Sequence, residues 1–304
     1  MTAMTGIPKV AVIMINYNGF SDTRECLESM YAVKYPNYRI FLVDNGSVDG
    51  EADMLDKLYG KTVTLIHSDR NLGFAGGNNT GVMVAKRMYN PDYYLFLNND
   101  TTVDPQFIDW LVLTTEYSHK VGAIVGKIML YDDPVRIEST GLNFSWWRGQ
   151  SYRRNFRHFD NLIYDPVREV DGASTNAFMV RREAVEKVGL FDESFFIYHD
   201  DIDYCIRLRQ AGYDILYAPM SKIYHKVGAS TKSSGIAYYY LARNNLKLMR
   251  KHTRGWRWWR FLAYFLGFHI WAIAVAYLVY HRRWVIVRKH FEGVWEGVKC
   301  VSSS

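Results

Sequence analysis

The sequence contains few of the residues typical of secreted, disulfide-bonded or disordered proteins. It has only three cysteines and seven prolines in 304 residues. Cys26, Cys205 and Cys300 have no metal-ligand spacing and cannot all pair, which excludes a disulfide scaffold and a zinc finger. With 49% hydrophobic and 22% charged residues, the chain is neither disordered nor collagen-like. We therefore expect one large folded domain with an appendage, in a reducing compartment.

Acidic residues are absent from the C-terminal segment Arg243–Lys289. This segment holds eleven of the 37 Lys and Arg residues, and without them the chain has fewer basic than acidic residues, although its net charge is +6. The excess positive charge is therefore confined to this C-terminal segment. This distribution disfavours nucleic acid as a partner and favours an anionic partner at the C-terminal end, such as an anionic membrane surface.

The basic segment brackets an apolar run, Phe261–Tyr280, with Trp and Arg on both sides. A helix of this length can cross a hydrocarbon core of about 30 Å. Val10–Ile15 is too short for a secretory signal, so we expect a cytosolic catalytic domain. A full span would then place Arg282 and Arg283 on the far side, against the positive-inside tendency. We favour a re-entrant or interfacial helix pair, with Val285–Val298 as the amphipathic partner. A buried core helix and a homo-oligomer interface are the alternatives.

The chain before this segment alternates short apolar runs with helical patterns. The predicted strands are Val10–Ile15, Ile40–Val43, Thr62–Ile66 and Tyr93–Leu97, and the predicted helices are Ser21–Tyr31, Gly50–Tyr59 and Gly76–Tyr89. This rhythm predicts right-handed βαβ units and an α/β fold, with a mostly parallel sheet covered on both faces. In such sheets ligands bind beyond the carboxyl ends of the strands.

Polar residues follow each of these strands. They are Asn16-Tyr17-Asn18-Gly19, Asp44-Asn45-Gly46-Ser47, Ser68-Asp69-Arg70-Asn71 and Asn98-Asn99-Asp100. A carboxylate such as Asp44 can accept a hydrogen bond from a base or ribose. Asp100 can offer a hard oxygen ligand to Mg²⁺ or Mn²⁺, which would hold a diphosphate. The alternatives are a turn with a helix N-cap for Asn45-Gly46-Ser47 and an ordinary β-turn for Asp100.

Two further patterns add to this site. The glycine-rich stretch Asn71–Asn79 opens a helix and predicts a helix N-terminus that faces an anion. The acidic cluster of Asp200, Asp201 and Asp203 offers a general base, since neighbouring carboxylates raise each other's proton affinity. Its alternative is an ordinary helix N-terminus, where acidic residues are common. His225 follows another pair of predicted strands, Ile215–Ala218 and the short run at Ile223.

Together these motifs resemble the inverting family 2 glycosyltransferases of the GT-A fold, and most of all the rhamnosyltransferase-like branch that builds cell-surface polysaccharides. The resemblance covers roughly residues 10–295. It implies a nucleotide-sugar donor, a saccharide or lipid-linked saccharide acceptor, and Mn²⁺ or Mg²⁺ as cofactor. Its metal position falls on Asp100, with His225 completing the metal shell, and its base on Asp201, or on Asp200 if the frame shifts by one residue.

The resemblance also implies the remaining ligand contacts. Donor-binding positions fall on Asn16, Tyr17, Asn18, Asp44, Asn45, Gly73, Asn78, Asn98, Asn99 and Arg243. The acceptor loop falls on Gly172 and Ala173, and we assign Trp146 and Trp147 to the acceptor site. The metal motif is Asn-Asn-Asp rather than Asp-x-Asp, so only Asp100 can ligate as a carboxylate. Asp200-Asp201 stands where the family usually has Glu-Asp.

These observations predict a GT-A catalytic domain over residues 1–240, with a donor half to about 130 and an acceptor half from about 131, and a membrane-associated segment over 241–304. We expect the enzyme at the cytoplasmic face of the cell membrane. A polyprenyl-phosphate sugar synthase and a non-catalytic sugar-binding protein are the alternative functions. An oxidoreductase is disfavoured, because the first strand is not followed by the dinucleotide fingerprint.

Overall fold

The computed structural model describes residues 6–160, 165–226, 235–280 and 282–302. These residues form two compact units, which are described separately. The first unit comprises Met1–Asn143, Arg153–Phe196 and Asp200–Val227, and the second comprises Phe144–Tyr152, Ile197–His199 and Gly228–Ser304. The domain boundary predicted at residue 240 falls inside α7 (Ile236–His252).

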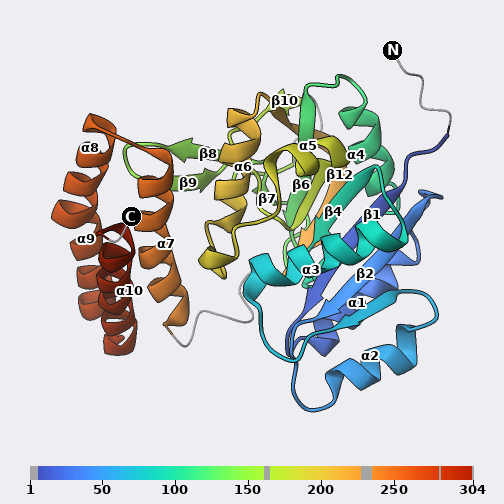
Figure 1. Ribbon diagram of the computed structural model, residues 1–304, viewed down its shortest axis with the longest axis horizontal. Helices are drawn as coiled ribbons and strands as arrows, with labels where there is room; N and C mark the ends of the chain where they lie inside the picture. The colour runs from blue at the N-terminus through green and yellow to red at the C-terminus, as the bar shows by residue number, and fades with distance from the viewer. Residues whose placement is uncertain (1–5, 161–164, 227–234, 281, 303–304) are drawn as a thin grey trace. The chain divides into compact units, whose positions relative to one another are not determined.

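The first unit is built on a ten-stranded mixed sheet (Figure 1). Its order is β10-β12-β6-β11-β4-β1-β2-β3, with β5 on β12 and β7 on β6. The bounds are β1 Val10–Asn16, β2 Tyr38–Asp44, β3 Thr64–His67, β4 Tyr93–Leu97, β5 Thr101–Val103, β6 Val121–Leu130, β7 Ile137–Ser139, β10 Arg168–Glu169, β11 Ala177–Arg181 and β12 Asp214–His225. Two shorter strands, β8 (Leu142–Ser145) and β9 (Gln150–Arg153), pair separately.

Helices cover both faces of this sheet, as the sequence predicts. The helices of this unit are α1 Phe20–Met30, α2 Glu51–Tyr59, α3 Gly73–Met88, α4 Phe107–Thr115, α5 Arg182–Val188 and α6 Asp200–Gln210. Along β1, Val10, Val12 and Met14 join an apolar cluster with residues of α1 and α4, while Ala11 and Ile13 join a second cluster with residues of α3, α5 and α6. Successive side chains of β1 point to opposite faces of the sheet, and helices cover both faces, so this central strand is apolar on both sides.

The four predicted strands and three predicted helices of the N-terminal half are confirmed with small shifts at their ends. The parallel pairs are β1 with β2, β1 with β4, β2 with β3 and β6 with β12. Within this sheet β11 runs antiparallel between β4 and β6. The prediction of two separate strands at Ile215–Ala218 and Ile223 is wrong, because a register shift between Ala218 and Lys222 keeps them in one continuous strand, β12.

The second unit is helical. After α7, a helix runs from Trp256 to Tyr280 through α8 (Trp256–Tyr264), a π-helical turn (Phe265–His269), α9 (Ile270–Val275) and a second π-helical turn (Ala276–Tyr280). It is followed by α10 (Trp284–Ser302), which confirms the predicted helix at Val285–Val298. Gly293 and Gly297 let α10 approach α7 closely: a Cβ atom on Gly293 would lie 2.2 Å from the Tyr239 carbonyl oxygen.

A buried charge network lies inside the first unit. Lys127 points from β6 with only 1% of its side chain exposed, and its Nζ lies 2.5 Å from Asp160 Oδ1 and 2.8 Å from Asp165 Oδ2. Lys222 Nζ lies 2.7 Å from the other oxygen of Asp160. Burial opposes the charge on Asp160 and Asp165. The hydrogen bonds from Lys127 outweigh it only together with those from Lys222 to Asp160 and from Tyr217 and Arg168 to Asp165, and they hold the pKa of both carboxyls below the usual value.

We predict that Lys127→Met lowers the free energy of unfolding by about 3–5 kcal/mol, because it removes the buried counter-charge that two partly buried carboxylates share. The loss should appear at neutral pH, above the unfolded-state pKa of about 4, and fade as the pH falls through the depressed pKa values. Urea denaturation at several pH values measures it. Lys86→Met is the control, since Lys86 pairs with Glu186 at the exposed surface and should cost at most about 1 kcal/mol.

Candidate active site

The ends of β1 and β2 are locked together by a buried amide. Asn16 pairs in register with Asp44 and is fully buried. Its Nδ2 lies 2.9 Å from Asp44 Oδ1, 3.0 Å from Ser47 Oγ and 3.1 Å from Glu51 Oε2, and its Oδ1 accepts a hydrogen bond from Thr23 Oγ1 at 2.7 Å. An amide has only two N–H groups for these three acceptors. Asn16 therefore fixes the position of the Asp44 carboxylate, whose other oxygen accepts from Ser47 N.

The next two residues of this loop are open to solvent. Tyr17 is 48% exposed, and Asn18 is exposed with φ +50°. Asn18 Oδ1 accepts a hydrogen bond from Val48 N at 2.9 Å, which ties the loop after β1 to the loop after β2. Both loops therefore form one surface at the carboxyl end of the sheet.

Asn45 holds the glycine-rich turn. Its Oδ1 accepts from Leu72 N at 3.0 Å, and its Nδ2 donates to Asn71 Oδ1 at 3.1 Å and to Gly73 O at 3.0 Å. Gly73 has φ +74°, and a Cβ atom there would lie 2.4 Å from the Phe196 carbonyl oxygen. Only glycine fits this backbone conformation and this close approach.

The first N–H groups of α3 already have hydrogen-bond partners within the protein. Phe74 N and Ala75 N both donate to Phe196 O, at 2.6 and 3.3 Å, and Gly73 N donates to Asn71 Oδ1 at 2.8 Å. The first N–H groups of the helix are thus satisfied by the protein. The expectation that this helix N-terminus faces an anion is wrong for that reason. Asn78, buried one turn later, donates to Phe74 O, and its contact with a donor stays a prediction.

The triplet Asn98-Asn99-Asp100, which follows β4, is anchored by hydrogen bonds from its two asparagines. Asn98 Nδ2 donates to Asn176 Oδ1 at 3.0 Å, and Asn99 Nδ2 donates to Thr23 Oγ1 at 2.8 Å. Asn98 Oδ1 is buried and has no hydrogen-bond partner among the described residues. Asn176 precedes β11 and carries no motif of its own, so it is not predictable from the sequence pattern.

Asp100 and His225 come together although 125 positions separate them, because β5 pairs antiparallel with β12 and sets Thr101 opposite His225. His225 Nε2 lies 3.3 Å from Asp100 Oδ1, and His225 Nδ1 lies 2.7 Å from Glu138 Oε2. Burial opposes the charge on His225, but the contacts with Asp100 and Glu138 outweigh it and raise its pKa to about 9. The prediction grouped Asp100 with His225 and missed Glu138.

This pair suits a divalent cation. Asp100 Oδ1 is buried and makes no well-directed hydrogen bond within the described ranges, although His225 is near it. In that part of the chain no group of three or more His, Cys, Asp and Glu side chains is arranged to hold a metal. A carboxylate and an imidazole nevertheless fit Mn²⁺ or Mg²⁺ when phosphate oxygens and water complete the shell.

The carboxylates at the start of α6 have different surroundings. Asp200 is buried, and its Oδ2 has no hydrogen-bond partner among the described residues, whereas Asp201 is half-buried and accepts from Ile202 N at 2.8 Å. Burial, then repulsion from Asp201, raises the pKa of Asp200 well above its usual value. Burial raises the pKa of Asp201 to about 6. Both carboxyls therefore bind a proton more readily than an exposed aspartate does.

Asp203 has a structural contact instead. It is fully buried, and its Oδ2 accepts from Arg207 Nε at 2.8 Å. The same guanidinium donates to the carbonyl oxygens of Val188 and Leu190, so the pair ties α6 to the end of α5.

The predicted acceptor loop is fixed against α6. Ala173 is buried, and its N donates to Cys205 Sγ at 3.4 Å. Burial raises the pKa of Cys205 to about 12, so the thiol stays neutral. Gly172 is buried as well and exchanges backbone hydrogen bonds with Leu142.

The backbone just before α6 is strained. Phe196, Tyr198 and His199 all have φ between +64° and +67°, which is uncommon for non-glycine residues and concentrates at functional sites. Within the second unit, the buried Asn244 donates from Nδ2 to Ile197 O at 2.8 Å and to Tyr198 O at 2.9 Å. Asn244 therefore holds part of this segment.

Three predicted ligand residues belong to the second unit. Trp146 and Trp147 are 42% and 39% exposed, and Trp147 packs against Tyr264 with ring centroids 4.9 Å apart. The Arg243 guanidinium lies 4.9 Å from the centre of the Tyr240 ring. Their roles in acceptor and donor binding stay predictions.

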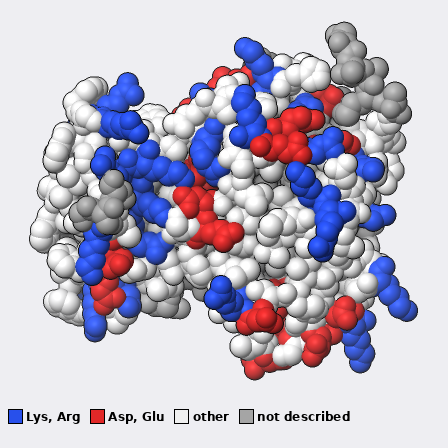
Figure 2. Space-filling view, viewed as in Figure 1, with Lys and Arg blue, Asp and Glu red and all other residues white. Residues whose placement is uncertain are grey.

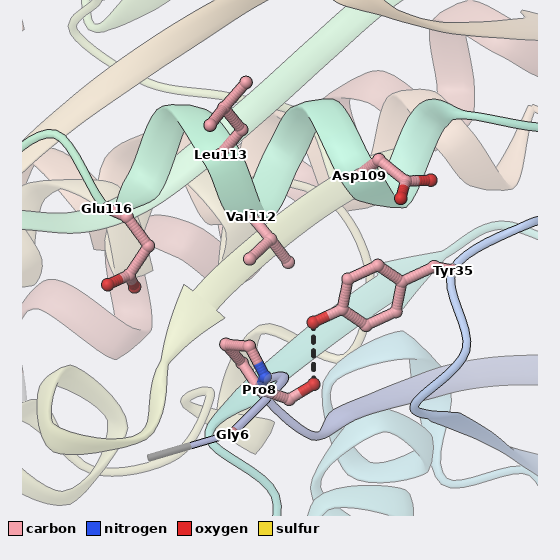
Figure 3. A pocket seen from close by; sticks show the side chains of 7 residues that line it. All are labelled: Gly6, Pro8, Tyr35, Asp109, Val112, Leu113 and Glu116. Carbon is pink, nitrogen blue, oxygen red and sulfur yellow. Dashed lines mark hydrogen bonds between the residues drawn. The ribbon is translucent and has the colours of Figure 1, made fainter. Parts of the chain in front are cut away.

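A cavity of about 470 Å³ lies elsewhere in the first unit (Figure 3). Pro8 and Tyr35 line it on one side, where Tyr35 OH donates to Pro8 O at 2.7 Å, and the other side is formed by α4 and Glu116. Pro8 and Tyr35 precede β1 and β2, so this cavity is at the amino ends of the strands. Ligands of open α/β sheets bind at the opposite edge, so we do not assign it to the active site.

The chain is similar in sequence to known proteins of glycan synthesis. The chain is 25% identical over 248 residues to the O-antigen biosynthesis protein RfbC of Myxococcus xanthus. The alignment covers 78% of this chain but only 19% of that protein. The chain is 24% identical over 267 residues to an N-acetylglucosaminyl-diphospho-decaprenol L-rhamnosyltransferase of Mycobacterium tuberculosis, covering 81% of this chain and 86% of the relative.

Solved structures share the fold. A mannosyltransferase from Pyrobaculum calidifontis, in complex with GDP-Man and Mn²⁺, aligns with a TM-score of 0.59 at 14% identity and covers 97% of this chain and 88% of its own. The model of the family described as "Glycosyltransferase like family 2" matches residues 8–252. With the GT-A type of fold and a family match over most of its length, this chain belongs to glycosyltransferase-like family 2.

Proposed function

We propose that this protein transfers a sugar, with inversion at the anomeric carbon, from a nucleotide-sugar donor to a saccharide or lipid-linked saccharide in the synthesis of a cell-surface glycan. The observation that carries the proposal is the contact of the buried Asp100 Oδ1 with His225 Nε2 at the carboxyl edge of the sheet. The test is release of nucleoside diphosphate from UDP-, dTDP- and GDP-sugars in the presence of a crude lipid-linked acceptor.

On the donor side, the Asp44 carboxylate is positioned by Asn16 to accept a hydrogen bond from a base or ribose. Tyr17, the residue after Asn16, is exposed and would offer an aromatic face to the base. Asp100 and His225 would hold the divalent ion. When bound, that ion supplies positive charge for the departing diphosphate, which gains negative charge in the transition state.

On the acceptor side, Asp201 is the proposed base that takes the proton from the attacking hydroxyl. Two observations favour it over Asp200. It is the less buried of the two, and its pKa of about 6 leaves it ionised at neutral pH, whereas burial and repulsion from Asp201 raise the pKa of Asp200 well above its usual value. A base of this pKa matches its task well near neutral pH.

We predict that Asp100→Ala abolishes the Mn²⁺-dependent part of nucleoside diphosphate binding, because no other carboxylate of its triplet can replace it. Calorimetry with UDP, dTDP and GDP, with and without Mn²⁺, measures this. Asp104→Ala, on the same stretch but beyond β5, is the control and should bind as the wild type does. Unchanged Mn²⁺-dependent affinity in Asp100→Ala would refute the metal assignment.

We predict that Asp201→Asn lowers the transfer rate by about 10²–10⁴-fold with donor affinity nearly unchanged, since a base acts on the acceptor. In the wild type, kcat should rise with pH through about 6, because only the deprotonated carboxylate accepts a proton. Asp200→Asn is the matched control and should keep most of the activity, as an amide resembles the neutral carboxyl. The reverse result for the two variants would move the base to Asp200.

We also propose that the second unit attaches the enzyme to the cytoplasmic face of an anionic membrane. One helical stretch of the described chain, Trp256–Val279, has the length and the mean hydropathy of 1.9 that crossing a bilayer requires. Large apolar side chains protrude from it, with Trp259 66%, Phe268 62% and Trp271 55% exposed. Figure 2 shows Lys and Arg side chains gathered over the C-terminal helices. Each is worth about 1 kcal/mol near an anionic leaflet.

We predict that replacing Trp259 and Phe268 together by Gln weakens sedimentation with anionic liposomes at least about tenfold, since burying one such side chain contributes about 1.5–3 kcal/mol. High salt should slow recruitment without stripping the wild type from the vesicles, because salt screens charge but not apolar burial. Tyr117→Gln, at a 78% exposed position of the first unit, is the control. A wild type that stays monodisperse and ignores liposomes at low salt would contradict the proposal.

A further inference from the structure

Glu138 is a buried carboxylate with both oxygens engaged. It is the central residue of β7 and only 2% of it is exposed. Its Oε2 lies 2.7 Å from His225 Nδ1, and its Oε1 lies 3.1 Å from Arg153 Nη1. No sequence motif and no part of the proposed sugar transfer uses it. A carboxylate so deeply buried is costly unless its position serves the groups that it contacts.

The strand order explains the contact with His225. β7 and β12 both pair with the end of β6: Met129 is opposite Ile137 in β7 and opposite Tyr224 in β12. The residues that follow Ile137 and Tyr224, Glu138 and His225, thus lie on the two strands that flank the same stretch of β6. The backbone therefore places them together, and their contact does not depend on a flexible loop.

The contact decides which ring nitrogen of His225 faces Asp100. Nδ1–H donates to Glu138, so Nε2 is turned toward Asp100 Oδ1, 3.3 Å away. An imidazole binds a metal through a nitrogen lone pair, and the hydrogen bond at its other nitrogen sets the tautomer and the ring orientation.

We propose that Glu138 is a positioning residue for the divalent cation: it holds His225 as the Nδ1–H tautomer with Nε2 directed at the position shared with Asp100. Arg153 assists by pairing with the second oxygen of Glu138, which keeps that carboxylate oriented with Oε2 toward the ring. Glu138 itself does not touch the ion. The inference rests on the proposed function, in which Asp100 and His225 hold the metal.

The test measures Mn²⁺ affinity directly, by electron paramagnetic resonance of free Mn²⁺ in the presence of UDP, for the full-length protein. Glu138→Ala should weaken Mn²⁺ binding about 10–100-fold, the usual effect of removing such an outer partner. Glu138→Gln should recover part of this loss, because its amide oxygen can still accept from Nδ1–H. The KM for Mn²⁺ should rise in both variants, with a smaller change in kcat at saturating metal.

Two further measurements separate the possible causes. Glu169→Gln removes a carboxylate that also pairs with an arginine, Arg209. Glu169 lies opposite Leu216, at the other end of β12 from His225, so this variant should bind Mn²⁺ as the wild type does. Urea denaturation without metal reports folding: Mn²⁺ affinity that falls only in proportion to the unfolded fraction overturns the positioning role.

If Asp100→Ala loses Mn²⁺ but both Glu138 variants keep it, the inference fails and the proposed function stands. If the wild type binds no Mn²⁺ with any nucleotide, both the metal part of the proposed function and this inference fail.

Discussion

β1 is hydrogen-bonded in parallel to β2 on one side and to β4 on the other, and it is buried on both faces. This pairing brings the strand ends to a common edge, so Asn16 meets Asp44 and the triplet after β4 begins beside them. The contact of Asn99 with Thr23, which in turn bonds to Asn16, extends the connection across the edge. A slip in this register would disperse the polar groups and would also turn the apolar side chains of β1 to the wrong face.

Two buried asparagines serve as backbone substitutes. Asn45, at this edge, closes the turn before α3 with both the donor and the acceptor of its amide. In the second unit, Asn244 donates to two carbonyl groups of the strained segment. Their amides satisfy loop backbone that a regular strand or helix would otherwise satisfy. Two carboxylates differ. Asp100 Oδ1 is buried with only His225 near it, and Asp200 Oδ2 is buried with no hydrogen-bond partner among the described residues. The amides give rigidity, and these two carboxylate oxygens mark where chemistry is expected.

The sequence predicts the N-terminal half well because its strands are apolar on both faces and its helices are short and regular. The grouping of Asp100 with His225 came from the family resemblance. Glu138 and Asn176 were out of reach, because their roles arise from long-range strand pairing at β7 and from the antiparallel β11. The anion site predicted at the glycine-rich turn failed for a similar reason: the Phe196 carbonyl that fills it comes from a segment more than 120 positions away.

The π-helical turn at Phe265–His269 has a consequence for the register of the whole C-terminal helix. The buried residues Phe261, Phe265, Ile270 and Ala274 are spaced by four, five and four positions, and the step of five crosses the π-helical turn. An uninterrupted α-helix advances about 100° per residue, so a single deletion inside this turn would rotate everything after it by that amount. The exposed Trp271 would then turn toward the packed face and Ile270 away from it. The extra residue in the π-helical turn thus corrects the rotation of the side chains about the helix axis. The helix therefore keeps its packed residues on one side and its exposed aromatic residues on the other.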